Sequence, residues 1–210
     1  MGLLSISPKS IAQSDNYDWS LKFGGTPFSY ISNSGTTYDW YGNSKGQEIL
    51  LGLGYKNYHL NASFRYFQNT IKKDLPYDYT IYSLPKGADV RMVFWNVSLS
   101  YEKEIVRRIF VEPNVGFLKN FTTSNIMDSK GNEFEIKDLL GLTLGVNLIK
   151  YIKFADGFYL GFYVSGNYNF IDYQKLNYGL KNNTLGYSIG AILKGTDVKK
   201  KNPPAKRNVH

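Results

Sequence analysis

Apolar and polar residues alternate one by one along most of the chain. From Tyr58 to Tyr66, alternate positions hold Tyr, Leu, Ala, Phe and Tyr, while the positions between them hold His, Asn, Ser and Arg. A helix cannot place residues in this way, so the pattern predicts β-strands. Most of the strands approach the roughly 9–11 residues that a membrane-crossing strand needs. The alternation predicts eight strands, at about 19–24, 48–55, 58–66, 93–101, 109–117, 140–148, 158–165 and 185–193.

The connections between these strands are short and long in turn. The short ones lie at 56–57, 102–106 and 150–156. The long ones lie at about 26–46, 70–89, 120–137 and 170–183. Short turns at one end and long loops at the other are typical of outer-membrane β-barrels.

The two faces of the strands differ in chemistry. One face carries Leu, Val, Ile, Phe, Trp and Tyr, and the other mainly Gly, Ser, Thr and Asn. A soluble lipocalin-like carrier would turn the large residues inward, but eight strands enclose too little space for them, and the outside would carry little charge. We therefore expect the apolar face to meet lipid and the small polar face to line the lumen.

Aromatic residues gather near the short turns, as expected for the girdle of a membrane barrel. The sequence places these five there: Tyr55, Tyr58, Tyr101, Tyr151 and Phe158.

The segment from Phe110 to Phe117, with this architecture, resembles the small eight-stranded outer-membrane proteins of Gram-negative bacteria, the OmpA/OmpX-like and porin-family barrels. A small-residue cleavage site before Gln13 and long connections rich in Asn, Lys and Tyr resemble the Bacteroidetes type of these proteins. The resemblance covers about residues 17–194. It implies an all-β, antiparallel, up-and-down transmembrane barrel with short periplasmic turns, long extracellular loops, no cofactor and a place in the outer membrane. Within the segment, Pro113 has no N–H for the ladder, so we expect a bulge or a strand end there.

A few charged residues interrupt the polar face. They are Lys22, Glu48, Arg65 and Glu112. An unpaired ion is costly in a narrow interior, so we expect Arg65 to contact Glu112 or Glu48. The pair could form a static polar plug, or it could act as the gate of a narrow passive channel.

A lipid-modifying enzyme is a further alternative, because some barrels of this size use a His with a Ser and an acid. His59 is the one His within the predicted barrel, and Ser63 lies four residues along the same strand, about 13 Å away at 3.3 Å per residue. A triad would need a Ser and an acid from other strands. We expect no catalytic residue and no metal site, since the chain has no Cys and only two His.

The long connections combine Tyr and Trp with small polar residues, a composition that suits binding surfaces. The candidates are Tyr38, Trp40, Tyr41, Tyr77, Tyr79 and Tyr82. A glycan, a peptide or an envelope protein complex would fit such loops; ordinary packing above the rim is the alternative.

The ends differ from the barrel in composition. Residues 1–12 resemble the remnant of a signal peptide, and residues 195–210 form a basic tail that carries much of the net charge of +8. The rest has no basic face with interleaved aromatics, which argues against nucleic-acid binding.

Overall fold

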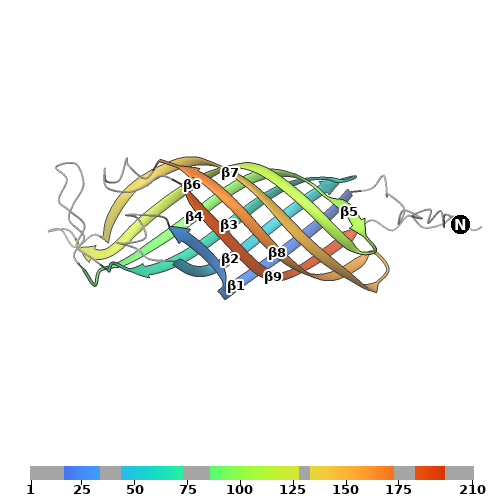
Figure 1. Ribbon diagram of the computed structural model, residues 1–210, viewed down its shortest axis with the longest axis horizontal. Coiled ribbons are helices and arrows are strands. Elements are labelled where there is room, and N and C mark those ends of the chain that lie inside the picture. Colours follow the sequence, from blue (N-terminus) through green and yellow to red (C-terminus); the bar gives the residue numbers. More distant parts are fainter. Residues whose placement is uncertain (1–16, 34–43, 73–85, 128–132, 173–182, 197–210) are drawn as a thin grey trace, which may run out of the picture.

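The computed structural model describes residues 17–33, 44–72, 86–127, 133–172 and 183–196, and nearly all of them lie in β-strands (Figure 1). The described part contains no helix that is long and apolar enough to cross a membrane. The strands are β1 (Tyr17–Asn33), β2 (Ser44–Tyr55), β3 (Tyr58–Thr70), β4 (Asp89–Tyr101), β5 (Lys103–Val106), β6 (Ile109–Met127), β7 (Glu133–Ala155), β8 (Phe158–Ile171) and β9 (Thr184–Thr196).

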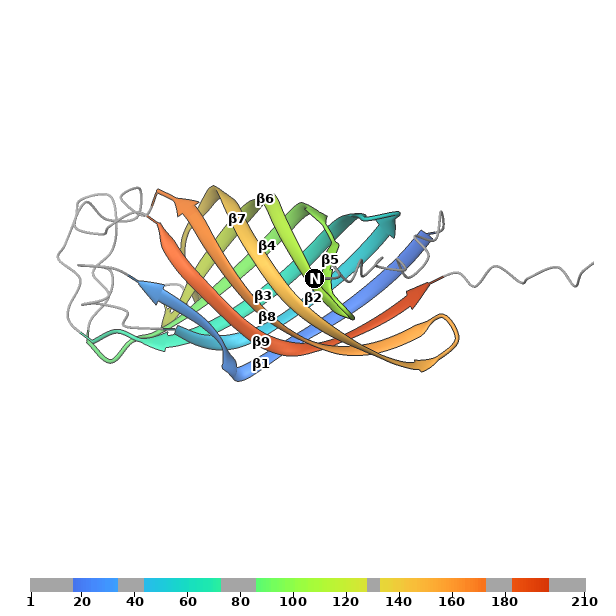
Figure 2. The same ribbon diagram turned by 45° about the vertical axis from the view of Figure 1, so that its right-hand side comes forward.

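The strands close into one antiparallel barrel. Strands that follow one another in the chain pair with each other, except β4 and β5, and β1 pairs with β9 to close the wall. β4 and β5 pair with successive parts of β6 and together take the place of one strand. The nine segments therefore form an eight-stranded barrel. Closure satisfies the hydrogen-bonding groups that an open sheet would leave at its edges. The strands run obliquely around the barrel axis (Figure 2).

Tight turns join the strands at one end. Lys56 and Asn57 form the β2–β3 turn, where Lys56 has a φ of 58°. At the β5–β6 turn Arg108 has a φ of 61°, and at the β7–β8 turn Gly157 has a φ of 78°. Such positive φ values let a turn follow the twist of its strands, and they suit Gly better than Arg. β1 begins and β9 ends at this same end, the right-hand end in Figure 1.

Several strands are longer than the alternation predicted. β1 continues to Asn33, so part of the loop predicted at 26–46 is strand. β6 continues to Met127 and β7 already begins at Glu133, so most of the loop predicted at 120–137 is strand as well. β7 also runs to Ala155, through most of the short turn predicted at 150–156. Backbone pairing continues here although the apolar and polar residues no longer alternate.

Pro113 lies at a break in the wall, as its missing N–H predicts. The pairing of β6 with β4 ends at Asn114, and its pairing with β5 begins at Val111, so Pro113 falls in the gap. Between β4 and β5, facing this gap, the N–H of Glu102 donates to the carbonyl of Asn57 at 2.8 Å instead of to β6. The registers on both sides of the gap continue one another and set Glu102 opposite Glu112.

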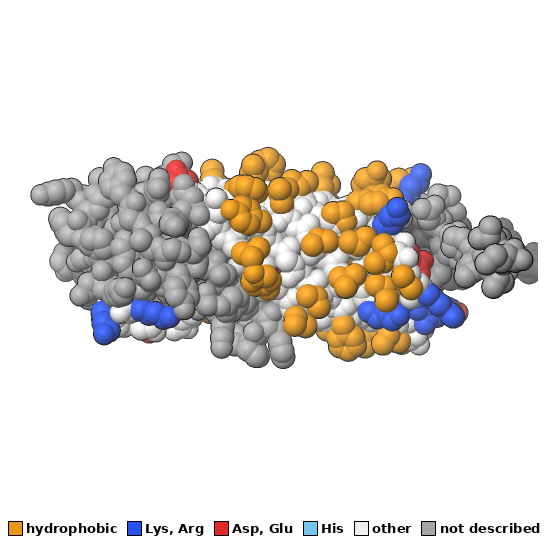
Figure 3. All heavy atoms as spheres, in the orientation of Figure 1, with side chains coloured by type: hydrophobic (Ala, Val, Ile, Leu, Met, Phe, Trp, Pro, Cys, Tyr) orange, Lys and Arg blue, Asp and Glu red, His pale blue; other side chains and the backbone are white. Residues whose placement is uncertain are grey.

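Side chains alternate strictly between the inside and the outside of the wall. Along β3 every second residue from His59 to Asn69 is buried, and those between are exposed or half-buried. The exposed face is made largely of Leu, Val, Ile and aromatic residues. Figure 3 shows these side chains as a broad hydrophobic band, with Lys and Arg gathered where it ends near the short turns.

Candidate functional site in the barrel interior

Arg65 and Glu48 form an ion pair inside the barrel. They are direct neighbours in the register of β2 and β3, and Arg65 Nε donates to Glu48 Oε1 at 2.6 Å. The hydroxyl of Tyr163, from β8, lies 3.4 Å from Glu48 Oε2. Of the two predicted partners, Glu48 and Glu112, Arg65 therefore pairs with Glu48. The register sets Lys22 between Leu50 and Ile192, but its side chain lies outside the described part.

Glu112 belongs to a second group of buried side chains. Its two carboxylate oxygens accept bonds from Ser100 Oγ and Asn147 Nδ2, each at 2.7 Å. His59 Nδ1 lies 3.4 Å from Glu112 Oε1. Glu112 is only 1% exposed, and these neighbouring donors compensate for the loss of water around its charge.

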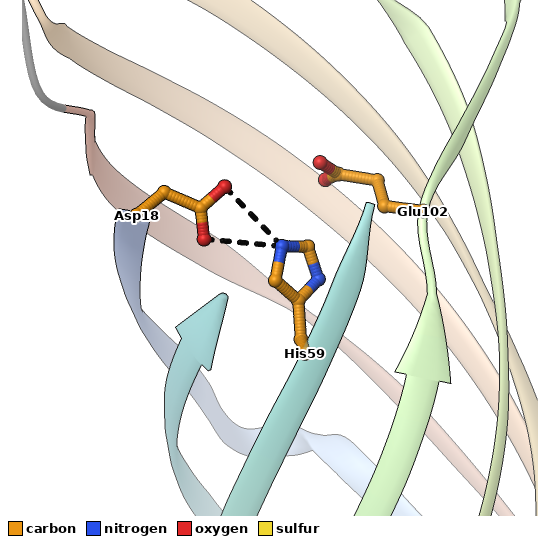
Figure 4. A group of neighbouring side chains, drawn as sticks. All are labelled: Asp18, His59 and Glu102. Carbon is orange, nitrogen blue, oxygen red and sulfur yellow. Dashed lines mark hydrogen bonds and ion pairs between the residues drawn. The ribbon is translucent and has the colours of Figure 1, made fainter. Parts of the chain in front are cut away.

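His59 lies between two carboxylates. Its Nε2 is 3.1 Å from Asp18 Oδ1 (Figure 4). Its Nδ1 faces Glu112 instead. Both ring nitrogens can donate at once only when the imidazole carries both protons, and this charged form suits the two flanking carboxylates. Gly54 makes the arrangement possible, because a Cβ built there would overlap both the Asp18 carboxylate and the His59 ring.

Lys194 ties this group to a third carboxylate. Its ammonium is 3.0 Å from Asp18 Oδ2 and also bonds Glu102 Oε2. Glu102 Oε1 accepts a bond from the hydroxyl of Tyr151 at 2.6 Å. All of these side chains are buried or nearly so. They come from β1, β3, β6, β7 and β9, and Glu102 lies between β4 and β5. We call this group the interior charge cluster: Asp18, His59, Glu102, Glu112, Tyr151 and Lys194.

Tyr151 is not part of the aromatic girdle, contrary to the prediction. The prediction placed it in a turn, but β7 continues past it, and the alternation makes Tyr151 an inward position that is 4% exposed. Its ring packs against Ile149, Tyr163 and Ile192 inside the barrel.

The other predicted girdle residues, Tyr55, Tyr58, Tyr101 and Phe158, are all exposed on the outer face. The Tyr58 and Tyr101 rings form a cross-strand pair with centroids 5.1 Å apart. Tyr17 and Trp19 of β1 extend this ring, contacting Tyr55 and Phe158.

Besides Tyr151, sequence reasoning missed three members of the interior charge cluster. Asp18 and Lys194 lie at the ends of the predicted barrel, and Glu102 lies in a segment predicted as a turn. Each lies one residue beyond its predicted strand, on the inward face, so extending these strands by a single residue would have found them.

The interior is less polar than predicted. Toward the long connections the inward side chains form an apolar layer, in which the rings of Phe67 and Phe94 lie 5.7 Å apart. The members of this layer are Phe67, Ile71, Val90, Met92, Phe94, Leu118, Leu139 and Ile171. The predicted strands stopped short of most of these residues, so their inward position was not predicted.

Between the apolar layer and the interior charge cluster lies a small polar cavity. Glu48, Arg65, Tyr163 and several Asn and Ser side chains line it. The centre of a water molecule has about 10 Å³ in which to move there, which is room for about one water molecule.

The cluster lacks the connections of a catalytic triad. Both nitrogens of His59 face carboxylates, and the hydroxyl of Ser100, its cross-strand neighbour, donates to Glu112 instead. No nitrogen of His59 is therefore placed to take a proton from Ser100.

The cluster also has some features of a metal site. One donor atom each from Asp18, His59 and Glu102 lies within 4.8 Å of the others, a ligand set that would suit zinc. The ammonium of Lys194 already bonds both carboxylates, however, so a metal ion would have to displace it. The residues therefore do not fit a resident metal.

The predicted loop residues Tyr38, Trp40, Tyr41, Tyr77, Tyr79 and Tyr82 lie outside the described residues, as do the predicted signal remnant and most of the basic tail.

Comparison with known proteins bears on the fold. No protein-family model and no curated protein matches the chain. Among solved structures, Neisserial surface protein A aligns with a TM-score of 0.52 and 15% identity, over 87% of this chain and 97% of that one. The fold is that of the small outer-membrane β-barrels.

Two further solved structures are similar at lower scores. Ail of Yersinia pestis aligns with a TM-score of 0.48 and 13% identity, over 86% of this chain and 99% of that one. OprG of Pseudomonas aeruginosa aligns with a TM-score of 0.48 and 12% identity, over 87% and 98%. At these identities the likeness concerns the fold alone.

Proposed function

We propose that the protein is a non-enzymatic barrel of the Gram-negative outer membrane, closed to ions, that holds its long connections at the cell surface as an interaction surface. Outer-membrane lipid covers the exposed apolar band, which would otherwise be a very large hydrophobic surface in water. The aromatic residues at the short-turn end support this placement, since such side chains favour the membrane interface.

The filled interior is the observation that carries the proposal. The apolar layer blocks the half of the lumen toward the long connections, and the interior charge cluster blocks the half toward the short turns. The cavity between them holds about one water molecule, too little for a hydrated ion to pass. The filled interior therefore favours a static plug over the gate of a channel as the role of the ion pairs.

Conductance in planar lipid bilayers tests the plug. We expect no discrete channel openings from the folded protein. Arg65→Ala removes the partner of Glu48 but leaves the apolar layer intact, so it too should remain closed. Single-channel steps from the unaltered protein that change with Arg65→Ala would instead establish the narrow channel.

The interaction surface is proposed from the composition of the long connections. Changing Tyr38, Trp40 and Tyr41, or Tyr77, Tyr79 and Tyr82, to Ser keeps the connections at full length. We expect at least one envelope protein to co-purify with the unaltered barrel and to be lost from one of these variants. Gels of unboiled and boiled samples show that each variant is folded. Identical sets of co-purified proteins, compared by quantitative mass spectrometry, would contradict a role for these residues.

A further inference from the structure

Cations outnumber carboxylates on β5, β6 and β7 at the short-turn rim. Lys103, Arg107 and Lys150 are exposed there, and none of them pairs with a carboxylate of the described residues. The two nearby acids are engaged elsewhere. Glu104 accepts a bond from the backbone N–H of Arg108, and Asp156 pairs with Lys153 at 2.6 Å.

The register brings these three cations together on the outer face. Lys103 pairs with Val111 and Lys150 pairs with Ile109, so the two lysines flank β6 two residues apart along the strand. Lys150 Nζ also donates to the backbone oxygen of Arg107 at 3.2 Å, which holds its ammonium at the β5–β6 turn. We call Lys103, Arg107 and Lys150 the rim patch.

Exposed apolar side chains surround the rim patch. Ile105 and Val106 are 53% and 62% exposed on β5, and Ile152 and Phe154 are 47% and 61% exposed on β7. The same stretch of wall thus offers several cationic donors at its border and apolar side chains around them. An acidic peptide would use the cations but gain little from the outward-facing apolar side chains. A lipid with a charged headgroup would use both.

We propose that the rim patch binds the phosphate of an anionic phospholipid in the leaflet that borders the short turns. This inference rests on the proposed membrane placement. Lysine and arginine bind phosphate through charge-assisted hydrogen bonds, and each cation near an anionic lipid surface contributes about fivefold to affinity. The acyl chains of the bound lipid would lie along Ile105 and Ile152.

Lipid retention tests the proposal. The barrel is reconstituted in vesicles of phosphatidylcholine mixed with phosphatidylglycerol, and the lipids that stay bound are identified by native mass spectrometry. We expect the protein to retain phosphatidylglycerol in preference. Lys103→Gln with Lys150→Gln should reduce the preference about 25-fold, because two contacts of about fivefold each are lost. Lys103→Arg with Lys150→Arg keeps both charges and should keep the preference.

The matched control removes the same charge from other exposed lysines. Lys56→Gln with Lys119→Gln should leave the preference within about twofold, because neither side chain belongs to the rim patch. An equal loss in both double variants would show diffuse charge and overturn a defined site. Retention of neither lipid in preference would also overturn it, as would full competition by inorganic phosphate or by an acidic peptide. A protein that inserts into no vesicle, with no heat-shifted band on gels, would refute the membrane placement itself.

Discussion

Lys194 is the residue whose replacement tests the interior charge cluster most directly. Its ammonium bonds Asp18 and Glu102, and the residue is only 8% exposed. Lys194→Met keeps a flexible side chain of similar length but leaves the two carboxylates without their shared cation. We expect this substitution to lower the free energy of unfolding strongly, because buried carboxylates that lose their counter-ion have no water to replace it.

The magnitude follows from the burial of the pair. Removing one partner of a buried ion pair typically costs about 3–5 kcal/mol. Every 1.4 kcal/mol is about tenfold, so the unfolding equilibrium should shift by about 150-fold or more. Lys119 provides the matched control, because its ion pair with Asp138 is 2.7 Å long but leaves the lysine 42% exposed. Lys119→Met should cost no more than about 1 kcal/mol, since exposed pairs are worth little.

Urea unfolding of the barrel in lipid vesicles measures both effects. Tryptophan fluorescence reports the transition, since Trp19 and Trp95 lie on the outer face and leave the lipid on unfolding. Adding Glu102→Gln to Lys194→Met should recover part of the loss, because one uncompensated charge disappears while the amide oxygen still accepts from Tyr151. Equal costs for Lys194→Met and Lys119→Met, or no recovery by Glu102→Gln, would refute the stabilising role of the cluster.

Three further substitutions, the first with a matched control, give distinct outcomes in the same unfolding assay. Gly54→Ala should cost about 1–3 kcal/mol because its Cβ overlaps the Asp18 carboxylate, whereas Gly166→Ala, with nothing within 4 Å, should cost nothing; equal effects would contradict the crowding argument. Arg108→Gly should raise the free energy of unfolding by about 1 kcal/mol, because it relieves a φ of 61°. A lower free energy of unfolding would show that contacts of the arginine side chain outweigh the backbone strain. Phe67→Ala should cost about 3–5 kcal/mol if the apolar layer is tightly packed, and a cost below 1 kcal/mol would indicate a loose lumen.

Strand type and the face of each strand were readable from the sequence. Alternation has a period of two residues in any strand, so Leu99 and Ser100 point to opposite sides whatever the rest of the chain does. The Arg65–Glu48 pair was also within reach, because a two-residue turn at Lys56 and Asn57 fixes the register of β2 against β3.

Where the strands end was not readable, because pairing with a neighbour can continue a strand after its alternation stops. Tyr151 was misplaced for this reason, and most of the apolar layer was missed for the same reason, although Phe94 itself lay within a predicted strand.

The interior charge cluster was decided by the tertiary structure alone. Asp18, His59 and Lys194 come from β1, β3 and β9, and they meet only because the barrel closes with one particular stagger between its strands. Local sequence determines which way each side chain points. Closure of the wall determines which side chains share a level in the lumen, since that depends on the registers of all the strand pairs together.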